Sequence, residues 1–482
     1  MRSRIQIQLC MLLAMWNLTA TEMAAAVRSG EHTAAEVVET HLERIAAVNP
    51  TVNAVTAVLG DSARAAAADI DRRRASGEPV GPLAGVPFTV KENIDIAGVA
   101  TTHGIPHFRD AVADTDSPTV ARLRAADAIP IGHANMPDLT IGGFTDSQLF
   151  GATVNPWGTI RDPSGSSGGD GAAVASGMAA IGLGNDAGGS VRGPALHGGI
   201  AALNPTYGRF PCEHRVGGRE PTLASQLIPK DGPLARSVTD LRAAFEVLAG
   251  TDPRDPRAVP VPLDGPPLPT PRVAVVADPG GLGVHPRVRA AIDTAAGILT
   301  DAGYVVETVA DVPRTADGLA TYGTLITSEF GPAWPGIRPL LTEDSARHME
   351  LSMQHQPPAD LRTYLQATAD RHAIVRDWHR FLAEYPLVLG PVSTEPPGDH
   401  DGAELDREQN LRLALARRLC TVSSLVGVPA VAVPTGPADG VPMGVQILGR
   451  PFREDLCLAA AAAVENAVGV LTPVFDVAPA GR

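Results

Sequence analysis

Apolar and polar residues follow two alternating patterns along the chain, one typical of amphipathic helices and the other of short buried strands. In residues 33–48, Thr33 is a good N-cap with Glu36 three residues later, and Val37 and Ile45 share one apolar face. Short apolar runs predict strands at residues 86–90, 128–131, 272–276, 387–389 and 430–433. Helices are predicted at residues 19–28, 33–48, 61–75, 118–126, 171–180, 238–248, 286–302, 404–425 and 454–468.

This alternation predicts an α/β fold with a central mixed, largely parallel sheet flanked by helices. We expect residues 18–475 to form a single domain after an N-terminal extension of residues 1–17. Residues 252–271, rich in Pro and Asp, are typical of an exposed connector. Residues 315–385 show no strand pattern and hold much of the aromatic content, which predicts a helical insertion or cap.

Composition limits the kinds of partner that the chain can have. Of its 482 residues 44% are apolar, which is enough for a sizeable core, and its net charge of −14 argues against nucleic acid. An apolar run at residues 9–16 follows Arg2 and Arg4 like the start of a signal peptide, but it is short and no clear cleavage site follows. No other stretch approaches the roughly 20 apolar residues of a membrane span. We therefore expect a cytoplasmic protein without a membrane partner.

The cysteines are widely separated, with no C-x-x-C pair and no histidine at a ligand spacing: Cys10, Cys212, Cys420 and Cys457. This pattern is typical of free thiols in a reducing cytosol rather than of disulfides or a zinc site. We therefore expect no metal and no cofactor.

The most informative stretch, residues 161–194, is rich in Gly and Ser. It contains SGSSGG at residues 164–169 and GNDAGGSVR at residues 184–192. A flexible linker has such a composition. However, residues 172–180 between the two clusters form a small-residue, helix-compatible run suited to burial, and a linker would not enclose a core helix.

Two other catalytic interpretations of this stretch are excluded by the residues in and around it. Residues 165–169 match G-x-S-x-G with Ser167 as nucleophile, but such an elbow needs an apolar strand before it, where Pro163 and polar residues stand. A phosphate-binding loop needs G-x-x-x-x-G-K-[ST], and this stretch has no lysine; its glycine spacing also misses G-x-G-x-x-G.

Both clusters closely resemble the signature of the amidase signature family, including the separation of Ser166 from Ser190. The sequence GVPFTVKEN at residues 85–93 is similar to the strand that carries that family's catalytic lysine. The resemblance covers roughly residues 18–470 and leaves residues 315–385 unmatched. Further similar segments are residues 135–136, 150–157, 205–209, 232–237, 442–446 and 449–452.

The resemblance implies a serine hydrolase that cleaves amide bonds without a metal. Ser190 would attack the amide carbonyl and become acylated, while Ser166 would relay its proton to Lys91 and later protonate the leaving nitrogen. The family has a cis peptide bond before the bridging serine, which is here the bond between Gly165 and Ser166. It places the oxyanion hole on the backbone of Ala187, Gly188, Gly189 and Ser190.

This role requires Lys91 to be neutral before catalysis. An exposed lysine has a pKa of about 10.4. Burial would lower that pKa, and the apolar run before Lys91 indicates that its strand enters the core. Strand alternation turns Glu92 to the opposite face. Lys230, the only other lysine, has Asp231 beside it and is predicted to be an exposed turn residue.

Four other residues receive supporting roles. Asp186 and Arg192 are predicted to support the site, with a purely structural ion pair as the alternative. Gly165 and Asn135 are predicted to bind substrate. The pocket is expected to be lined by residues 135–148 and 315–385.

Three positions depart from the family's pattern, and none is a member of the triad. His197 stands where the family usually has Cys, Asn185 where it has Thr, and Asn204 where it has Lys. A histidine triad is the standard alternative for a serine hydrolase. We expect His197 instead to be packed or to line the substrate pocket.

These predictions favour a free-standing amidase that hydrolyses a small or medium carboxylic amide through an acyl-enzyme. The alternative is the glutaminase-type subunit of the tRNA-dependent amidotransferase, which uses the same triad. That subunit typically has S-L-D-Q-x-G-P after P-T-Y-G-R, whereas residues 221–233 read PTLASQLIPKDGP. A binding protein with a dead site is disfavoured because the triad is complete. The expected partner is a small-molecule amide, and a homodimer is compatible with the sequence.

Overall fold

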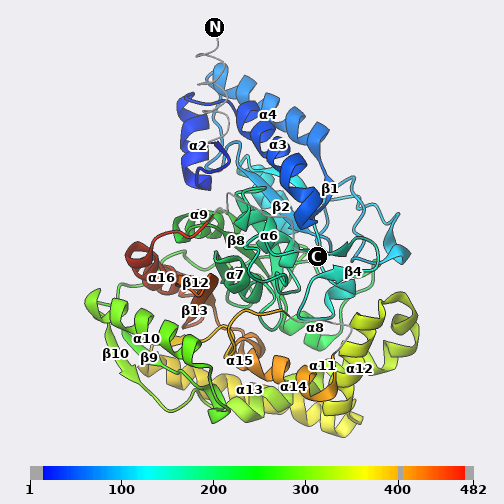
Figure 1. The fold of residues 1–482 in the computed structure, drawn as a ribbon, viewed down its shortest axis with the longest axis vertical. Coiled ribbons are helices and arrows are strands. Elements are labelled where there is room, and N and C mark those ends of the chain that lie inside the picture. Colours follow the sequence, from blue (N-terminus) through cyan, green and yellow to red (C-terminus); the bar gives the residue numbers. More distant parts are fainter. Residues whose placement is uncertain (1–14, 400–404, 473–482) are drawn as a thin grey trace.

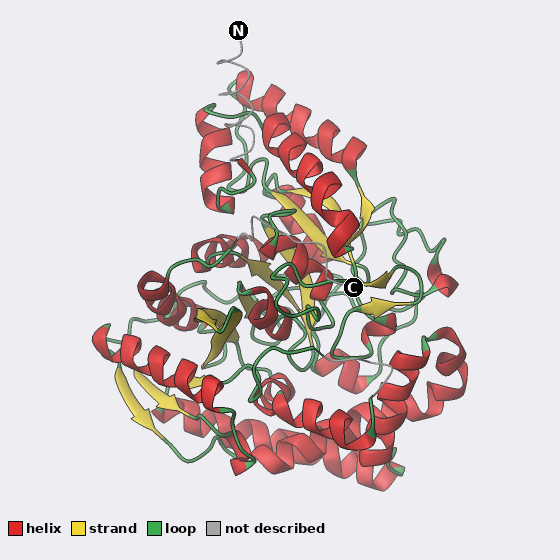
Figure 2. Ribbon diagram, viewed as in Figure 1, coloured by secondary structure: helices red, strands yellow, loops and turns green. Residues whose placement is uncertain are grey.

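A computed structural model describes residues 15–399 and 405–472 of the chain. The predicted extension of residues 1–17 and the apolar run at residues 9–16 fall almost entirely outside these residues. In the described chain, helices pack around one central twisted sheet (Figures 1 and 2). Every helix in the two described ranges is either too short or too polar to span a bilayer.

The described residues form an eleven-stranded sheet in the order β1-β3-β2-β6-β8-β7-β12-β13-β11-β9-β10, and a separate pair β4-β5. Parallel pairing joins β3, β2 and β6 near one edge and β11, β9 and β10 at the other. Strands β8, β7, β12 and β13 connect these two blocks by antiparallel pairing. The predicted α/β fold with a mixed central sheet is confirmed. The strands are β1 (Val55–Val58), β2 (Pro87–Lys91), β3 (Ile129–Ala134), β4 (Asp146–Ser147), β5 (Gly151–Ala152), β6 (Ile181–Asp186), β7 (Ala201–Asn204), β8 (Lys230–Ala235), β9 (Arg272–Val275), β10 (Val305–Thr308), β11 (Leu387–Gly390), β12 (Ala430–Ala438) and β13 (Val441–Gly449).

The predicted helices are present with two main differences, and the helices at Arg192–Gly198 and Leu223–Leu227 were not predicted. The helix predicted at residues 171–180 ends at Ala175, and Gly177 follows with a φ of 76°. The helix predicted at residues 404–425 is two helices, because the backbone of Arg417 leaves helical geometry at φ −96° and ψ 19°. The α-helices are α2 (Ala20–Ser29), α3 (Ala34–Val52), α4 (Gly60–Ala75), α5 (Pro118–Ala125), α6 (Gly168–Ala175), α7 (Arg192–Gly198), α8 (Leu223–Leu227), α9 (Val238–Leu248), α10 (Pro286–Asp301), α11 (Thr315–Ile337), α12 (Glu343–His355), α13 (Leu361–Glu384), α14 (Arg407–Ala416), α15 (Arg418–Val426) and α16 (Glu454–Val468). Short 3-10 turns are η1 (Pro106–Phe108), η2 (Asp138–Thr140), η3 (Pro279–Gly281) and η4 (Arg338–Leu340).

The core lies on both faces of the sheet. On β12, Val431 and Val433 pack into the largest apolar cluster together with residues of α16. Ala430 and Ala432 alternate with them and pack into clusters on the other face, which contain residues of α15 and α7. Period-two alternation of this kind is expected of a strand that is covered on both sides.

The segment at residues 315–385 is built from α11, η4, α12 and α13, and it lies along one end of the molecule (Figure 1). Leu325 of α11 and the fully buried Trp378 of α13 share an apolar cluster with Val422 of α15. The segment therefore packs directly on the helix that follows Arg417. Its assignment as an insertion or cap of one domain at residues 18–475 stays a prediction.

Candidate active site

The predicted catalytic residues converge at one edge of the sheet. Strands β3, β2 and β6 run parallel, so their carboxyl ends meet there, as is usual for ligand sites in α/β folds. Lys91 ends β2, and the loop from Asp186 to Ser190 follows β6. The amide of Ser167, next to Ser166, donates to the carbonyl of Ser190 at 3.1 Å. The structure thus brings both predicted serine segments and the lysine strand together.

Lys91 is completely buried and bonded to two side chains. Its Nζ lies 2.7 Å from Ser166 Oγ and 2.8 Å from Asn185 Oδ1. The amide nitrogen of Asn185 in turn donates to Asn93 Oδ1 at 3.0 Å, which fixes the oxygen towards the lysine. Asn185 was noted in the sequence only as a departure from the family, and its contact with Lys91 was not foreseen.

Burial lowers the pKa of Lys91 from 10.5 to about 7. Three carboxylates act against this shift, those of Asp170, Asp186 and Asp231. Glu92 does not take part, because its carboxylate accepts hydrogen bonds from the hydroxyls of Thr56 and Thr102 instead. At neutral pH a substantial share of Lys91 is therefore uncharged, as a general base requires.

Ser166 is buried and follows a cis peptide bond from Gly165, as expected. Arg417 holds this segment: its guanidinium donates to the carbonyl of Gly165 at 3.0 Å and to Ser164 Oγ at 2.8 Å. A Cβ on Gly165 would lie 2.8 Å from the carbonyl oxygen of Phe144, so only glycine fits. The substrate-binding role of Gly165 stays a prediction, while Arg417 was missed because nothing in its local sequence marks it.

The loop after β6 is organised by the carboxylate of Asp186. This carboxylate accepts the amide of Gly189 at 2.6 Å and that of Val191 at 3.3 Å. The Gly189 amide, one of the four predicted oxyanion donors, is therefore engaged by Asp186. In the part of the chain that the structure describes, the amides of the other three predicted donors have no protein acceptor: Ala187, Gly188 and Ser190.

Asp186 and Arg192 form a completely buried bidentate pair, with N–O distances of 2.9 and 3.0 Å. Burial alone would raise the pKa of Asp186, but the charge and hydrogen bonds of Arg192 hold that pKa below its usual range. Arg192 also donates to Ser423 Oγ and Gln446 Oε1, both at 2.8 Å. The pair therefore joins the loop after β6 to α15 and β13.

Asn135 was predicted to bind substrate, which stays a prediction, while its side chain is engaged by protein. Its side chain donates to the carbonyl of Gly151 at 2.8 Å and to Thr153 Oγ1 at 3.0 Å. Its oxygen accepts from the Met136 amide and from Ser147 Oγ, both at 3.0 Å. Every hydrogen-bonding position of this buried amide is therefore occupied by protein, and Asn135 acts as a support for the chain around it.

The two alternative serine mechanisms find no support in the geometry. His197 is buried and its Nδ1 lies 3.0 Å from the carbonyl oxygen of Asp162, which makes it a packed histidine. Ser167 is also buried and stands at the start of α6 with a loop, not a strand, before it. The nucleophile elbow at Ser167 is therefore wrong.

Lys230 was predicted to be an exposed turn residue, which is wrong. It is the first residue of β8, pairs with Asp186 across the sheet and is only 2% exposed. Among the described residues, its Nζ has no hydrogen-bond partner. Burial lowers the pKa of Lys230 to about 7, although the charge of Asp186 opposes this.

We expect Lys230→Met to raise the free energy of unfolding at pH 7 by about 2–4 kcal/mol, because a buried unpaired amine is replaced by an apolar chain. Between pH 7 and about 10.5 the unfolded chain holds a proton on Lys230 that the folded chain lacks, so stability rises with pH in that window. The variant should lose this rise. Urea unfolding at several pH values measures both the gain in unfolding free energy at pH 7 and its change with pH. A variant that is less stable than the wild type at pH 7 would contradict the expected gain.

Tyr322 of α11 is a residue of the helical segment 315–385 that lies beside the candidate active site. Its hydroxyl would lie 3.1 Å from a Cβ placed on Gly188, so it borders the loop after β6. Burial raises the pKa of Tyr322 to about 12, which keeps the hydroxyl protonated at neutral pH. No local sequence signal could have identified this residue, because it comes from a stretch without a family match.

The fold and the Lys–Ser arrangement define a hydrolase class, and comparison with known families agrees. The Amidase family model matches residues 36–458. The chain belongs to this family, and it is an amide hydrolase.

Three similar proteins indicate which kind of amide hydrolase the chain resembles most. Indoleacetamide hydrolase of Bradyrhizobium diazoefficiens is 41% identical over 460 residues, which are 95% of this chain and 87% of that protein. A glutamyl-tRNA(Gln) amidotransferase subunit of Salinispora tropica is 34% identical, over 95% of this chain and 98% of that one. The solved structure of a bacterial aryl acylamidase of the amidase signature family superposes with a TM-score of 0.79 at 27% identity, over 96% of this chain and 99% of that one. The higher identity to the hydrolase favours a free-standing amidase over the amidotransferase subunit.

Proposed function

We propose that Ser190 is the nucleophile of this amide hydrolase and that Ser166 and Lys91 carry its proton. The observation behind the proposal is the buried contact of 2.7 Å between Lys91 Nζ and Ser166 Oγ. With the amine neutral, Ser166 donates to Nζ and accepts the proton of Ser190 as that hydroxyl attacks the carbonyl carbon. The proton then passes through Ser166 to the leaving nitrogen. Water repeats the sequence on the acyl-enzyme and releases the carboxylate.

Charge on the tetrahedral oxygen would be stabilised by the loop after β6. The free amides of Ala187, Gly188 and Ser190 are the donors that we assign to it, without Gly189. The protonated hydroxyl of Tyr322 adds a side-chain donor beside Gly188. Removing one such donor typically costs about 10²–10³ in rate.

As the substrate class we propose arylacetamides, primary amides that carry an aromatic ring on the acyl side. The 41% identity to an indoleacetamide hydrolase supports this class. An aromatic side chain beside the loop after β6 also supports it, since Tyr322 borders Gly188. The products would be an arylacetate and ammonia.

The test is a panel of amides with the purified full chain and no added subunit. We expect ammonia release from indoleacetamide and phenylacetamide, and slower turnover of benzamide and of an acyl anilide. Coupled detection of ammonia, with detection of aniline for the anilide, measures the rates. The proposal would be contradicted if glutamine were the only amide hydrolysed. It would also be contradicted if turnover appeared only after amidotransferase subunits were added.

We further propose that the chain acts in the cytoplasm with a small amide as its only required partner. Three free buried cysteines in the described residues support a reducing compartment: Cys212, Cys420 and Cys457. The net charge of −14 supports the absence of a nucleic-acid partner. A homodimer is compatible with this function.

A further inference from the structure

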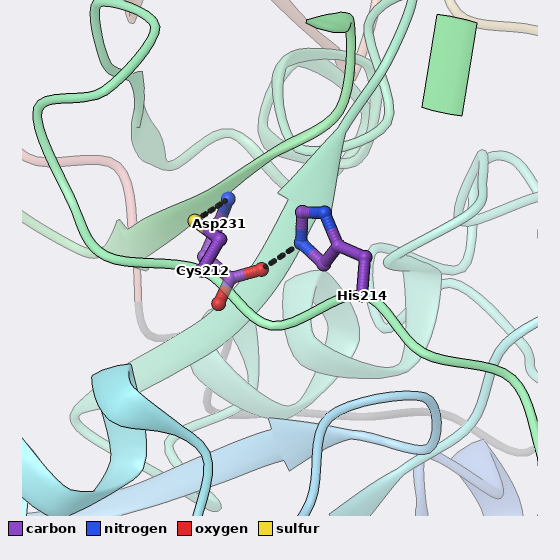
Figure 3. Close-up of side chains that lie close together, drawn as sticks. All are labelled: Cys212, His214 and Asp231. Atoms are coloured by element: carbon purple, nitrogen blue, oxygen red, sulfur yellow. Dashed lines mark hydrogen bonds and ion pairs between the residues drawn. The ribbon is translucent and has the colours of Figure 1, made fainter. Parts of the chain in front are cut away.

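Cys212, His214 and Asp231 lie together at the sheet edge that holds the candidate active site, yet the proposed hydrolysis uses none of them (Figure 3). Cys212 and His214 come from the loop between β7 and α8, and Asp231 is the second residue of β8. One donor atom from each residue lies within 4.8 Å of the other two. We expected no cysteine with a histidine at a ligand spacing, which was wrong, because the loop brings Cys212 and His214 together and a separate strand adds Asp231.

Two contacts hold the three side chains beside one another, and the Cys212 thiol also donates to the carbonyl of Phe210 at 3.5 Å. His214 Nε2 lies 2.8 Å from Asp231 Oδ1, as the dashed line in Figure 3 marks. The amide of Asp231 donates to Cys212 Sγ at 3.4 Å. Cys212 is 5% exposed and the side chain of His214 12%, so the cluster is shielded and the imidazole is more exposed than the thiol.

We propose that Cys212, His214 and Asp231 bind one divalent ion of the zinc class, with water as the fourth ligand. Thiolate sulfur, imidazole nitrogen and carboxylate oxygen are zinc donors, whereas Mg²⁺ and Ca²⁺ take oxygen ligands. One thiolate and one carboxylate balance the two charges of the ion. Binding releases the thiol proton, and the proton of His214 moves from Nε2 to Nδ1, so that the neutral imidazole offers Nε2 to the ion.

The distances are within reach of tetrahedral coordination. Zinc bonds of about 2.0–2.3 Å set neighbouring donor atoms about 3.3–3.8 Å apart. The three donor atoms, already within 4.8 Å of one another, would need shifts of about 1 Å at most. The bond of 2.8 Å between His214 and Asp231 would open slightly as the ion replaces its proton.

The surroundings supply the outer contacts that such a site needs. The hydroxyl of the buried Thr119 donates to Asp231 Oδ2 at 2.8 Å, which leaves Oδ1 facing the cluster. The amide of Asp231 stabilises a thiolate on Cys212. Asp231 also pairs with Asn185 across the sheet. The ion would therefore fasten the loop before α8 to the strand beside the active site.

The test uses the full chain after removal of metal with a chelator, and Co²⁺ and Zn²⁺ alone as probes. We expect one Co²⁺ to bind per chain and to give the visible bands of tetrahedral cobalt together with a thiolate-to-cobalt charge-transfer band. Both kinds of band should disappear when Zn²⁺ displaces the Co²⁺. Cys212→Ser, His214→Gln and Asp231→Asn should each weaken Zn²⁺ binding by at least about 100-fold. Thr119→Val should weaken it by about 10–100-fold.

Cys457→Ser is the matched control, because it removes a buried cysteine of α16 outside the cluster, and it should keep the band and the affinity. X-ray absorption of the wild-type chain with Zn²⁺ should show a single sulfur at about 2.3 Å, a readout that depends on no variant. The proposal is overturned by a charge-transfer band that survives in folded Cys212→Ser, by an oxygen-only coordination sphere, or by the lack of stoichiometric binding.

Discussion

Ser190→Ala is expected to lower kcat by about 10⁵- to 10⁶-fold while the fold stays intact, because the acyl group then has no hydroxyl on which to form. Ser190 is partly exposed on the loop after β6, so the loss of one oxygen leaves the packing of the loop unchanged. Ammonia release from phenylacetamide measures the rate, and circular dichroism with thermal unfolding measures the fold.

Ser167→Ala is the matched control for this change. Ser167 belongs to the same Gly/Ser segment, but its hydroxyl is buried and donates to the carbonyl of Asn185 at the long distance of 3.4 Å. We expect its kcat to stay within about tenfold of the wild type, since a hydrogen bond of this kind contributes little. The assignment of the nucleophile is wrong if Ser167→Ala is inactive and Ser190→Ala is not.

Lys91→Met should lower kcat/KM by at least about 10³-fold, because it removes the base and keeps the apolar stem. Lys230→Met is the control, since Lys230 is the other lysine of the chain and is also buried, but its amine has no hydrogen-bond partner within the described ranges. Steady-state kinetics on both variants should show the loss in Lys91→Met alone. Similar rates in the two variants would exclude Lys91 as the base.

The same role fixes the pH dependence of the wild-type enzyme. Because the base must be neutral, kcat/KM should fall as pH drops through about 7, where Lys91 takes up its proton. Asn185→Asp would place a carboxylate against Nζ and favour the ammonium, so the fall should move to higher pH. A pH profile that does not move in Asn185→Asp would assign the fall to another group.

The sequence predicted strands at five apolar runs, such as β2, but missed others, among them β6. Ile181–Asp186 reads IGLGND, whose glycines hide the pattern of a strand. A Cβ on Gly182 would lie 2.8 Å from Asp170 Cβ, and one on Gly184 would lie 2.5 Å from Ser167 Oγ. β6 therefore packs so closely on α6 and Ser167 that it needs glycines at these positions. Glycines add nothing to the apolar pattern by which a strand is recognised in a sequence.

The resemblance to a family identified Lys91, Ser166 and Ser190, but not the residues that hold them. Asn185 lies 94 residues from Lys91 in the chain, and Arg417 lies 252 from Gly165, so no local pattern connects them. The burial of Lys230 was missed for a similar reason. Its polar neighbour Asp231 suggested a surface turn, whereas pairing of β8 with β6 places both in the interior.

The contacts of Arg192 and Arg417 bear on how this enzyme can be engineered. Arg192 reaches Ser423 and Gln446, and Arg417 reaches back to Gly165. Grafting the Gly/Ser segment onto another scaffold, or trimming the chain after residue 399, would keep the serines. Either change would remove Arg417, Ser423 and Gln446, which hold the segments that carry the serines. The smallest portable catalytic unit is therefore nearly the whole polypeptide.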